Sequence, residues 1–295
     1  MTKGSFTIRQ LETVEDYKAA EEVQRRAWGL SDLDITPLHI LLTIHKSGGL
    51  VLGAFDEQTD TLLGFLLGFY GRSEDGHWKH CSHQMGVLPE ARDRGIGQAL
   101  KLEQRRLILA EGLDLITWTF DPLEARNATL NFTKLGVISN HYVRNIYGDT
   151  LGEINAGLPT DRLSVDWWIR SPRVQERIDP TQRAAGQQGL SDVLAQAKPI
   201  LSVTRHADGL VVPGDYDLPD IDQPVILEIP SDFQALKAAD SALALRWRLT
   251  TQAIFERYFE AGYTATECVL DQSGGYRRNI YILEFLWNGP WVKWR

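Results

Sequence analysis

The chain has 295 residues, of which 43% are hydrophobic and 24% are charged, and its formal net charge is −8. This length predicts one large or two small domains, at roughly 100–200 residues each, and the composition is that of an ordinary globular protein. The excess of acidic residues, 39 against 31 basic ones, argues against a general nucleic-acid binder, which needs a basic face to neutralise phosphates.

Cysteines and apolar runs indicate the compartment. The two cysteines, Cys81 and Cys268, are too few for a disulfide framework or a cysteine-rich zinc site. Residues 1–5 lack the apolar core of a secretion signal. The longest apolar stretch, Leu62–Tyr70, is far shorter than the ~20 residues that span a bilayer. We therefore expect a cytoplasmic protein that binds neither membrane nor nucleic acid.

The apolar spacing predicts alternating strands and helices up to residue 170. In chain order these are a strand at 6–9, helices beginning after Thr13 and at Pro37, strands at 50–55, 61–70 and 78–87, a helix at 98–111, a strand at 113–120, a helix at 123–135 and a strand at 164–169. Thr13 and Asp16 form a capping-box pattern, and Thr36 before Pro37 is a second helix start with Thr36 as the cap. Antiparallel strands followed by a strand-helix-strand unit indicate an α/β (α+β mixed sheet) fold with helices packed on the sheet.

The pattern weakens after residue 170. Residues 171–224 contain several prolines and polar runs, which predict an irregular connector with one short helix near 191–197. Regular pattern returns over 225–295, with a strand at 225–229, a helix over 233–261 and a hairpin of 263–270 with 277–285. We therefore expect a first domain over 1–170 and a C-terminal α+β extension.

The extension has a possible origin in the first domain. Val225–Leu270 and Leu115–His141 share the order strand, polar turn, helix, glycine, strand. The extension is either a degenerate copy of that half or a chance recurrence of a common unit.

One loop carries a phosphate-binding pattern. A strand runs out through Val87, the chain turns at Pro89, and Arg92-x-x-Gly95-x-Gly97 opens a helix. Helix N-termini leave backbone N–H groups unpaired and carry partial positive charge. Glycines remove the Cβ atoms that would keep a phosphate from those groups. The loop therefore predicts a pyrophosphate site, and a purely structural glycine turn is the alternative.

Two other phosphate motifs do not fit. A Walker loop needs Lys and Ser or Thr after its glycines, but Gly97 is followed by Gln98 and Ala99. A dinucleotide fingerprint needs a third glycine and a parallel strand-helix-strand unit that begins the domain.

The loop resembles motif A of the GNAT acyltransferases, in which Arg/Gln-x-x-Gly-x-Gly/Ala grips the pyrophosphate of acetyl-coenzyme A. The resemblance covers about the first 170 residues in element order. It implies that the strand before the loop bulges, splays from the next strand and pairs with the pantetheine arm. The cofactor-binding residues that it implies are Met85, Gly86, Val87, Arg92, Asp93, Arg94, Gly95, Ile96, Gly97, Gln98 and Asn127.

The following helix resembles a second GNAT motif, Asn-x-x-Ala…Tyr-x-Lys-x-Gly-Phe, with two departures. Phe132 stands where the family's tyrosine often protonates the leaving thiolate, and Val137 replaces the final phenylalanine. Because Phe cannot donate a proton, that general-acid route is absent. Asn127 either contacts the pantetheine arm or serves as a helix cap or surface residue.

His83 is the candidate general base. Counting back from Arg92, it stands where arylalkylamine acetyltransferases of this family carry a histidine, and an imidazole of pKa ~6.5 suits proton removal. Cys81 replaces the glutamate of histone-type members, which excludes a carboxylate base there. A strand places Cys81, His83 and Met85 on one face and alternate residues on the other. A hydrogen-bonded strand histidine is the alternative role.

A metal site is not expected. The same alternation places His83 with His77 and opposite His80, so the three histidines do not converge. Further along the chain, two roles are open for Asp121 and Glu124. One of them anchors a cationic acceptor, or they cap the following helix, with Asp121 as the N-cap and Glu124 at the third position.

The sequence as a whole resembles a little-described GNAT group of about 300 residues. The resemblance implies an N-acyltransferase that moves an acetyl or succinyl group from coenzyme A to the amine of a small molecule, with amino acids as one option. The expected partners are an acyl-CoA and a small amine, and a homodimer stays open. The alternatives are a non-catalytic coenzyme A-binding sensor and a nucleotide-binding regulatory domain.

Overall fold

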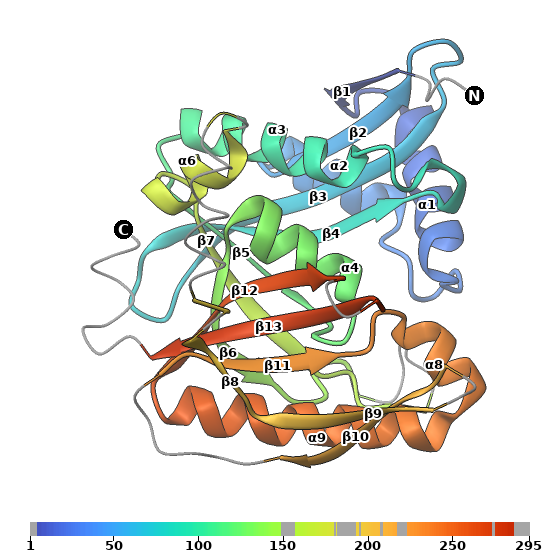
Figure 1. Cartoon of the computed structure of the whole chain (residues 1–295). Coiled ribbons are helices and arrows are strands. Elements are labelled where there is room, and N and C mark those ends of the chain that lie inside the picture. Colours follow the sequence, from blue (N-terminus) through green and yellow to red (C-terminus); the bar gives the residue numbers. More distant parts are fainter. Residues whose placement is uncertain are drawn as a thin grey trace. The chain divides into compact units, whose positions relative to one another are not determined.

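The chain folds into two compact units. The computed structural model describes residues 5–148, 157–179, 181, 193–194, 196–206, 209–216, 223–272 and 275–285. The first unit ends at Trp118 and the second begins at Thr119, within strand β5 (Leu115–Phe120). Both units combine strands with helices (Figure 1), so the predicted mixed α/β class is confirmed.

The first unit contains an ordered sheet. Its strands are β1 (Phe6–Gln10), β2 (Leu50–Asp56), β3 (Leu62–Arg72), β4 (Trp78–Val87) and β5, in that order across the sheet. Neighbours from β1 to β4 are antiparallel, whereas β4 and β5 are parallel. The strands expected from the sequence are thus present, with ends shifted by one or two residues.

Three helices cover this sheet, namely α1 (Val14–Trp28), α2 (Leu38–Lys46) and α3 (Ile96–Ala110). The Thr13–Asp16 capping box of α1 is confirmed. The cap expected at Thr36 is wrong, because Pro37 occupies the N-cap position of α2 and the Thr36 hydroxyl donates instead to Gln84 Oε1 at 3.0 Å.

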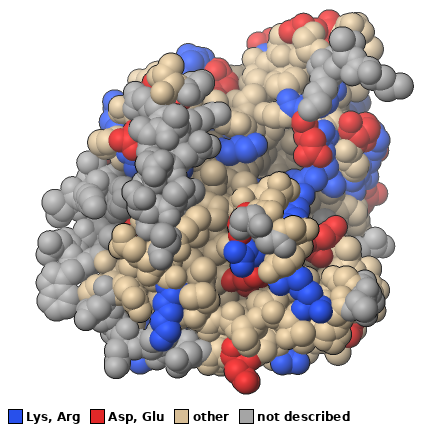
Figure 2. Space-filling view, in the orientation of Figure 1, with Lys and Arg blue, Asp and Glu red and all other residues tan. Residues whose placement is uncertain are grey.

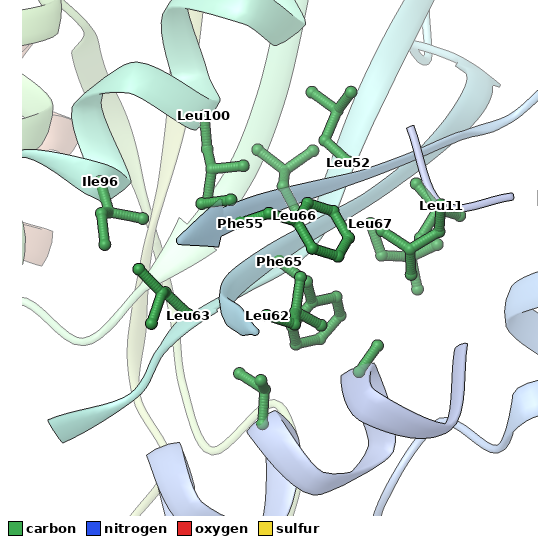
Figure 3. Packing of buried hydrophobic residues seen from close by; sticks show 14 of the residues in the cluster. Leu11, Leu52, Phe55, Leu62, Leu63, Phe65, Leu66, Leu67, Ile96 and Leu100 are labelled. Atoms are coloured by element: carbon green, nitrogen blue, oxygen red, sulfur yellow. The ribbon is translucent and has the colours of Figure 1, made fainter. Parts of the chain in front are cut away.

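The core of the first unit lies between the sheet and its helices. Ile96 and Leu100 project from α3 into one cluster with Leu63 and Leu66 of β3 (Figure 3). On the other face, the Trp28 ring of α1 lies edge-on to Phe65, with ring centroids 6.0 Å apart. Helices therefore cover both faces of β3, which explains its continuous apolar sequence.

A bulge interrupts β4 at His83. Leu67 pairs with Gln84 and the next residue, Gly68, pairs with Ser82, so His83 is an extra residue in the ladder. Ser82 contacts Gln104 of α3, while Gln84 contacts Thr36. The simple alternation expected along this strand is therefore wrong, because the bulge reverses the faces after His83.

The second unit has its own strand order. Its strands are β7 (Arg162–Trp168), β6 (Ile138–Val143), β12 (Tyr263–Asp271), β13 (Arg278–Phe285), β11 (Val225–Ile229) and β8 (Lys198–Pro199), named across the sheet. All these pairs are antiparallel except β11 with β8.

The connector is more ordered than expected. It contains helix α6 (Pro172–Ile178) and a two-stranded sheet of β9 (Leu201–Arg205) and β10 (Val211–Tyr216). Pro172 opens α6, where a missing N–H costs nothing, and Pro213 lies in the small β9–β10 sheet. The prolines therefore mark element starts and edges here. The helix expected near 191–197 lies partly outside the described residues.

The remaining helices also depart from the simple pattern. The helix expected at 123–135 is α4 (Ala125–Ala128) followed by a π-helix at Thr129–Leu135. The long helix expected at 233–261 is two helices, α8 (Phe233–Ala239) and α9 (Ser241–Glu260), because Asp240 breaks the run and caps α9 through Leu243 N.

The strand pairing favours an internal repeat. Pairs β6–β7 and β12–β13 each follow a strand and a helical segment, and β6 meets β12 antiparallel at Ser139 and Ala265. Equivalent strands that pair antiparallel are what a local two-fold axis generates. This symmetry favours the copied half over chance recurrence.

The surface is mixed in charge. Figure 2 shows Lys and Arg side chains interspersed with Asp and Glu over the face drawn, which gives that face no extended positive field. In the described part of the chain, no helix has the length and apolar character needed to cross a bilayer.

Candidate active site

The phosphate-binding pattern lies at the start of α3. A short turn at Pro89–Ala91 leads into Asp93 and Gly95, both with positive φ, and the helix begins at Ile96. Gly95 is the N-cap, and as a glycine it has no side chain to cap the first turn. A Cβ placed on Gly95 would meet nothing within 4 Å. The backbone N–H groups of the first turn of α3 are the donors that a phosphate site at a helix N-terminus uses.

The two arginines of the loop also hold it in place. Arg92 donates to the carbonyl of Ala27 in α1 at 3.1 Å. Arg94 lies 3.6 Å from the Asp56 carboxylate at the end of β2. Each arginine therefore anchors the loop as well as adding positive charge beside the helix N-terminus.

Strands β4 and β5 form a fork next to this loop. Their parallel register joins His80 with Ile116 and Cys81 with Thr117, yet β4 continues to Val87. Beyond Cys81 the described part of β4 is paired with β3 alone. Among the described residues, the opposite edge of Ser82–Val87 thus has no strand partner, so β4 and β5 part at this point, as the GNAT resemblance implies.

The strand residues assigned to the cofactor have distinct surroundings. Gly86 faces α1, where a Cβ would lie 3.2 Å from the Trp28 ring. Met85 and Val87 pack against the cluster of apolar residues around α3. Gly86 therefore permits close helix packing on one face.

His83 is an exposed imidazole in the bulge. Its ring lies 5.7 Å from the Phe69 ring and makes no hydrogen bond within the described residues. Partial burial lowers its pKa below the usual 6.5, so it is neutral near pH 7. This geometry favours a free base over the hydrogen-bonded strand histidine.

His80 has a different environment from His83. It is fully buried, and burial lowers its pKa to about 3. No group of three His, Cys, Asp or Glu among the described residues is placed to hold a metal ion.

The residue at the tyrosine position of the second motif, Phe132, is enclosed by other aromatic rings. Phe132 is fully buried, and its ring packs edge-on against Phe120 and Tyr281. The Tyr281 hydroxyl donates to the Pro122 carbonyl at 2.8 Å, and burial raises its pKa well above 10. Tyr281 therefore does not replace the missing proton donor.

Asn127 belongs to the second unit, unlike the other ten residues assigned to the cofactor. It is exposed on α4, and the N-cap of that helix is Glu124. The capping role considered for Asn127 is therefore wrong, and the surface and cofactor roles stay open.

Asp121 is held by a residue that the sequence did not single out. Arg248 of α9 donates to both carboxylate oxygens at 2.8 and 2.5 Å, and Arg162 lies 3.6 Å away. Burial alone would raise the pKa of Asp121, but the charge and hydrogen bonds of Arg248, together with the charge of Arg162, outweigh it and lower the pKa. Because its carboxylate is buried and paired, Asp121 is not an acceptor anchor.

Glu124 is likewise engaged. Its carboxylate accepts a hydrogen bond from Gln234 Nε2 at 2.5 Å, and burial raises its pKa. The signal for Arg248 was available in the sequence, since it lies on the buried stripe of α9 with Trp247 and Thr251. A charged residue on such a stripe calls for a buried partner.

Comparison with known proteins gives likenesses of fold only. No protein-family model and no curated protein matches the chain. Among solved structures, it is similar to the ribosomal-protein-S18-alanine N-acetyltransferase of Escherichia coli, with 19% identity and a TM-score of 0.44 over 56% of this chain and 94% of that one. It is also similar to a GNAT-family acetyltransferase of Streptococcus pneumoniae, with 17% identity and a TM-score of 0.44 over 55% and 98%.

A third similar structure is yncA of Salmonella typhimurium with its cofactor acetyl-CoA, at 18% identity and a TM-score of 0.45 over 56% of this chain and 94% of that one. Likenesses at these values assign no activity. The GNAT resemblance of this chain rests on the Arg92–Gly97 loop and on the strand, fork and helix around it.

Proposed function

We propose that the chain is an acyl-CoA-dependent N-acyltransferase of the GNAT type. The observation that carries this proposal is the N-terminus of α3, which opens on the N-cap glycine Gly95, directly after a strand that parts from its parallel neighbour. The helix N-terminus suits a pyrophosphate. The unpartnered edge of β4 suits an arm that hydrogen bonds like a strand.

The cofactor contacts follow from this placement. The first-turn N–H groups of Ile96, Gly97 and Gln98 would receive the pyrophosphate, with Arg92 and Arg94 adding charge. The backbone of Met85–Val87 would pair with the pantetheine arm. The thioester would then end at the fork, beyond Met85 toward Ser82.

The chemistry is direct transfer to an amine. His83 would take a proton from the acceptor ammonium so that the free amine can attack the thioester carbon. Backbone N–H groups near Val87 would stabilise the developing oxyanion. The acyl group is acetyl or succinyl, and the acceptor is a small amine such as an amino acid. The enzyme would act in the cytoplasm without a metal.

Cofactor binding tests the assignment of the loop. Valine at Gly97 would occupy the space of the pyrophosphate, so Gly97→Val should lose most acetyl-CoA affinity in calorimetry while staying folded. Gly71→Val is the matched control, because a Cβ at Gly71 meets nothing within 4 Å and the residue lies on β3. Unchanged affinity in folded Gly97→Val would show that the pyrophosphate lies elsewhere.

The missing tyrosine hydroxyl at Phe132 favours a second candidate, a coenzyme A-binding sensor without turnover. Incubation with acetyl-CoA or succinyl-CoA and a panel of amines separates the two, because a sensor binds without releasing free thiol. Tighter binding of ATP or NAD than of coenzyme A would instead indicate a nucleotide-binding regulatory domain.

A further inference from the structure

A strip of polar residues is buried between α3 and β4. Lys101 is 2% exposed, Ser82 is 4% exposed, and Gln104 and His80 are fully buried. These residues occupy helix and strand positions that face the interior, where apolar residues are the rule. Their presence in the core of the first unit calls for a reason.

Hydrogen bonds connect the strip in one direction. Lys101 Nζ donates to Ser82 Oγ at 2.8 Å, and Ser82 Oγ donates to Gln104 Oε1 at 3.2 Å. Gln104 Nε2 then lies 3.1 Å from His80 Nδ1, which must accept because the amide nitrogen is a donor. This series of hydrogen bonds begins at Lys101 and fixes the donor and acceptor role of each group.

Lys101 has no acidic partner. No Asp or Glu within the described residues pairs with Nζ, and burial lowers its pKa well below that of an ordinary lysine. The titratable groups that face it are also uncharged. Burial lowers the pKa of His80 to about 3 and raises the pKa of the Cys81 thiol. Burial without a counterion therefore favours the neutral amine of Lys101 over the ammonium.

A neutral amine has two hydrogens and one lone pair. One hydrogen is donated to Ser82, and Nζ lies 3.5 Å from the centroid of the Trp118 ring, whose face attracts the other. Both hydrogens are thus engaged on the protein. The lone pair is left to accept a proton.

The amine lies at the fork. The last residues that pair between β4 and β5 are Cys81 and Thr117. The next residue is Ser82 on β4 and Trp118 on β5. Lys101 contacts both of these residues. Of the two basic groups near the fork, His83 lies with Phe69 on one face of β4, whereas Lys101 lies on the α3 face.

We propose that Lys101 is the proton carrier of the acyl transfer and supplies the acid that Phe132 cannot. This inference rests on the proposed function, in which the thioester ends at the fork. His83 would prepare the amine on its own face of β4. Lys101 would serve the tetrahedral intermediate from the α3 side.

The step balances in atoms and charge. The amine nitrogen forms a bond to the thioester carbon, and its extra proton passes to the lone pair of Lys101. The carbon–sulfur bond then breaks with its electron pair on sulfur, and the lysine ammonium returns the proton to the thiolate. One amine can reach both atoms, because nitrogen and sulfur are bonded to the same carbon in the intermediate. Lys101 ends neutral, as it began.

Replacement of Lys101 by Met tests the carrier, because Met keeps the length of the side chain without the amine. We expect kcat to fall by about 10²–10⁴ with little change in the KM for acetyl-CoA. Lys101→Arg should be equally impaired, since a guanidinium does not give up its proton. Lys79→Met, which removes a lysine of β4, should retain wild-type kcat and serves as the control.

A structural role would give a different result. If Lys101 only fills space and donates to Ser82, then Lys101→Arg or Lys101→Met would keep kcat once folding is verified by circular dichroism, and the proposal is overturned. If the wild-type protein turns over no amine, the proposed function itself is refuted. A loss of turnover only in the Lys101 variants leaves the proposed function intact and supports the role of Lys101.

A direct measurement needs no turnover. Nitrogen-15 NMR of the Lys101 side chain should report a neutral amine at pH 7, with a shift on addition of acetyl-CoA. An ammonium signal at that pH, or no response to acetyl-CoA in protein shown by calorimetry to bind it, would overturn the proposal whether or not an acceptor is known.

Discussion

At the residue scale, the proposed reaction depends on the protonation state of His83. Its pKa is lowered by partial burial, so the imidazole is neutral at pH 7 and becomes protonated only as the pH falls through that lowered value. Activity should therefore decline on the acidic side. His83→Gln should lower kcat by about 10²–10⁴ and remove this acidic limb from the pH–rate profile.

The control is His77→Gln, which changes an exposed histidine just before β4. It should keep both the rate and the pH profile of the wild type. Wild-type turnover with an unaltered profile in His83→Gln would exclude His83 as the base.

The pair of Asp121 and Arg248 is a second feature at this scale. Removal of one charge leaves the other buried without compensation, which costs about 3–5 kcal/mol. Asp121→Asn should therefore lower the free energy of unfolding by this amount, measured by urea denaturation. The double variant Asp121→Asn/Arg248→Met should lose less than the sum of the single variants. A loss below about 1 kcal/mol in Asp121→Asn would show that the pair contributes little.

At the element scale, local signals predicted most of the helices and strands. The capping box at Thr13 fixes the start of α1, and the alternation of β11 and β13 gives their bounds within one residue. These elements were predictable because their determinants are neighbours in sequence. Asp240 was also a readable signal, since Asp favours the N-cap and breaks a helix in its interior.

Other elements depend on distant residues. The bulge at His83 is set by the register between β3 and β4 and changes no local pattern. Because the bulge reverses the faces, the sequence did not place Ser82 opposite Gln84, nor Lys101 beside the fork. The turn through Gly95 into α3 was predictable from its glycines, whereas the contact of Lys101 with Ser82 and the identity of the partner of Arg248, Asp121, needed the packed structure.

At the scale of the whole molecule, the extension completes the sheet of the second unit. Strand β12 pairs with β6, and Arg248 of α9 neutralises Asp121. A chain that ends at Gln223 would leave the edge of β6 unpaired and the buried Asp121 carboxylate without its closest partner, Arg248. We expect this fragment to aggregate or to lack a cooperative unfolding transition.

To test this, the solubility and the thermal unfolding transition of fragment 1–223 are compared with those of the full chain. A soluble fragment with a sharp transition and full acyltransferase activity would show that the extension neither completes the core nor supports the site.

The pairing of Asp121 with Arg248 has a consequence for biosynthesis, because the two residues are 127 positions apart in the sequence. At about 5–20 residues per second, the ribosome adds Arg248 roughly 6–25 s after Asp121. During that interval the Asp121 carboxylate lacks its two hydrogen bonds from Arg248, and β6 lacks its β12 neighbour. The second unit therefore cannot close until α9 and β12 have been synthesised, and until then the nascent chain presents a strand edge that a holding chaperone would recognise.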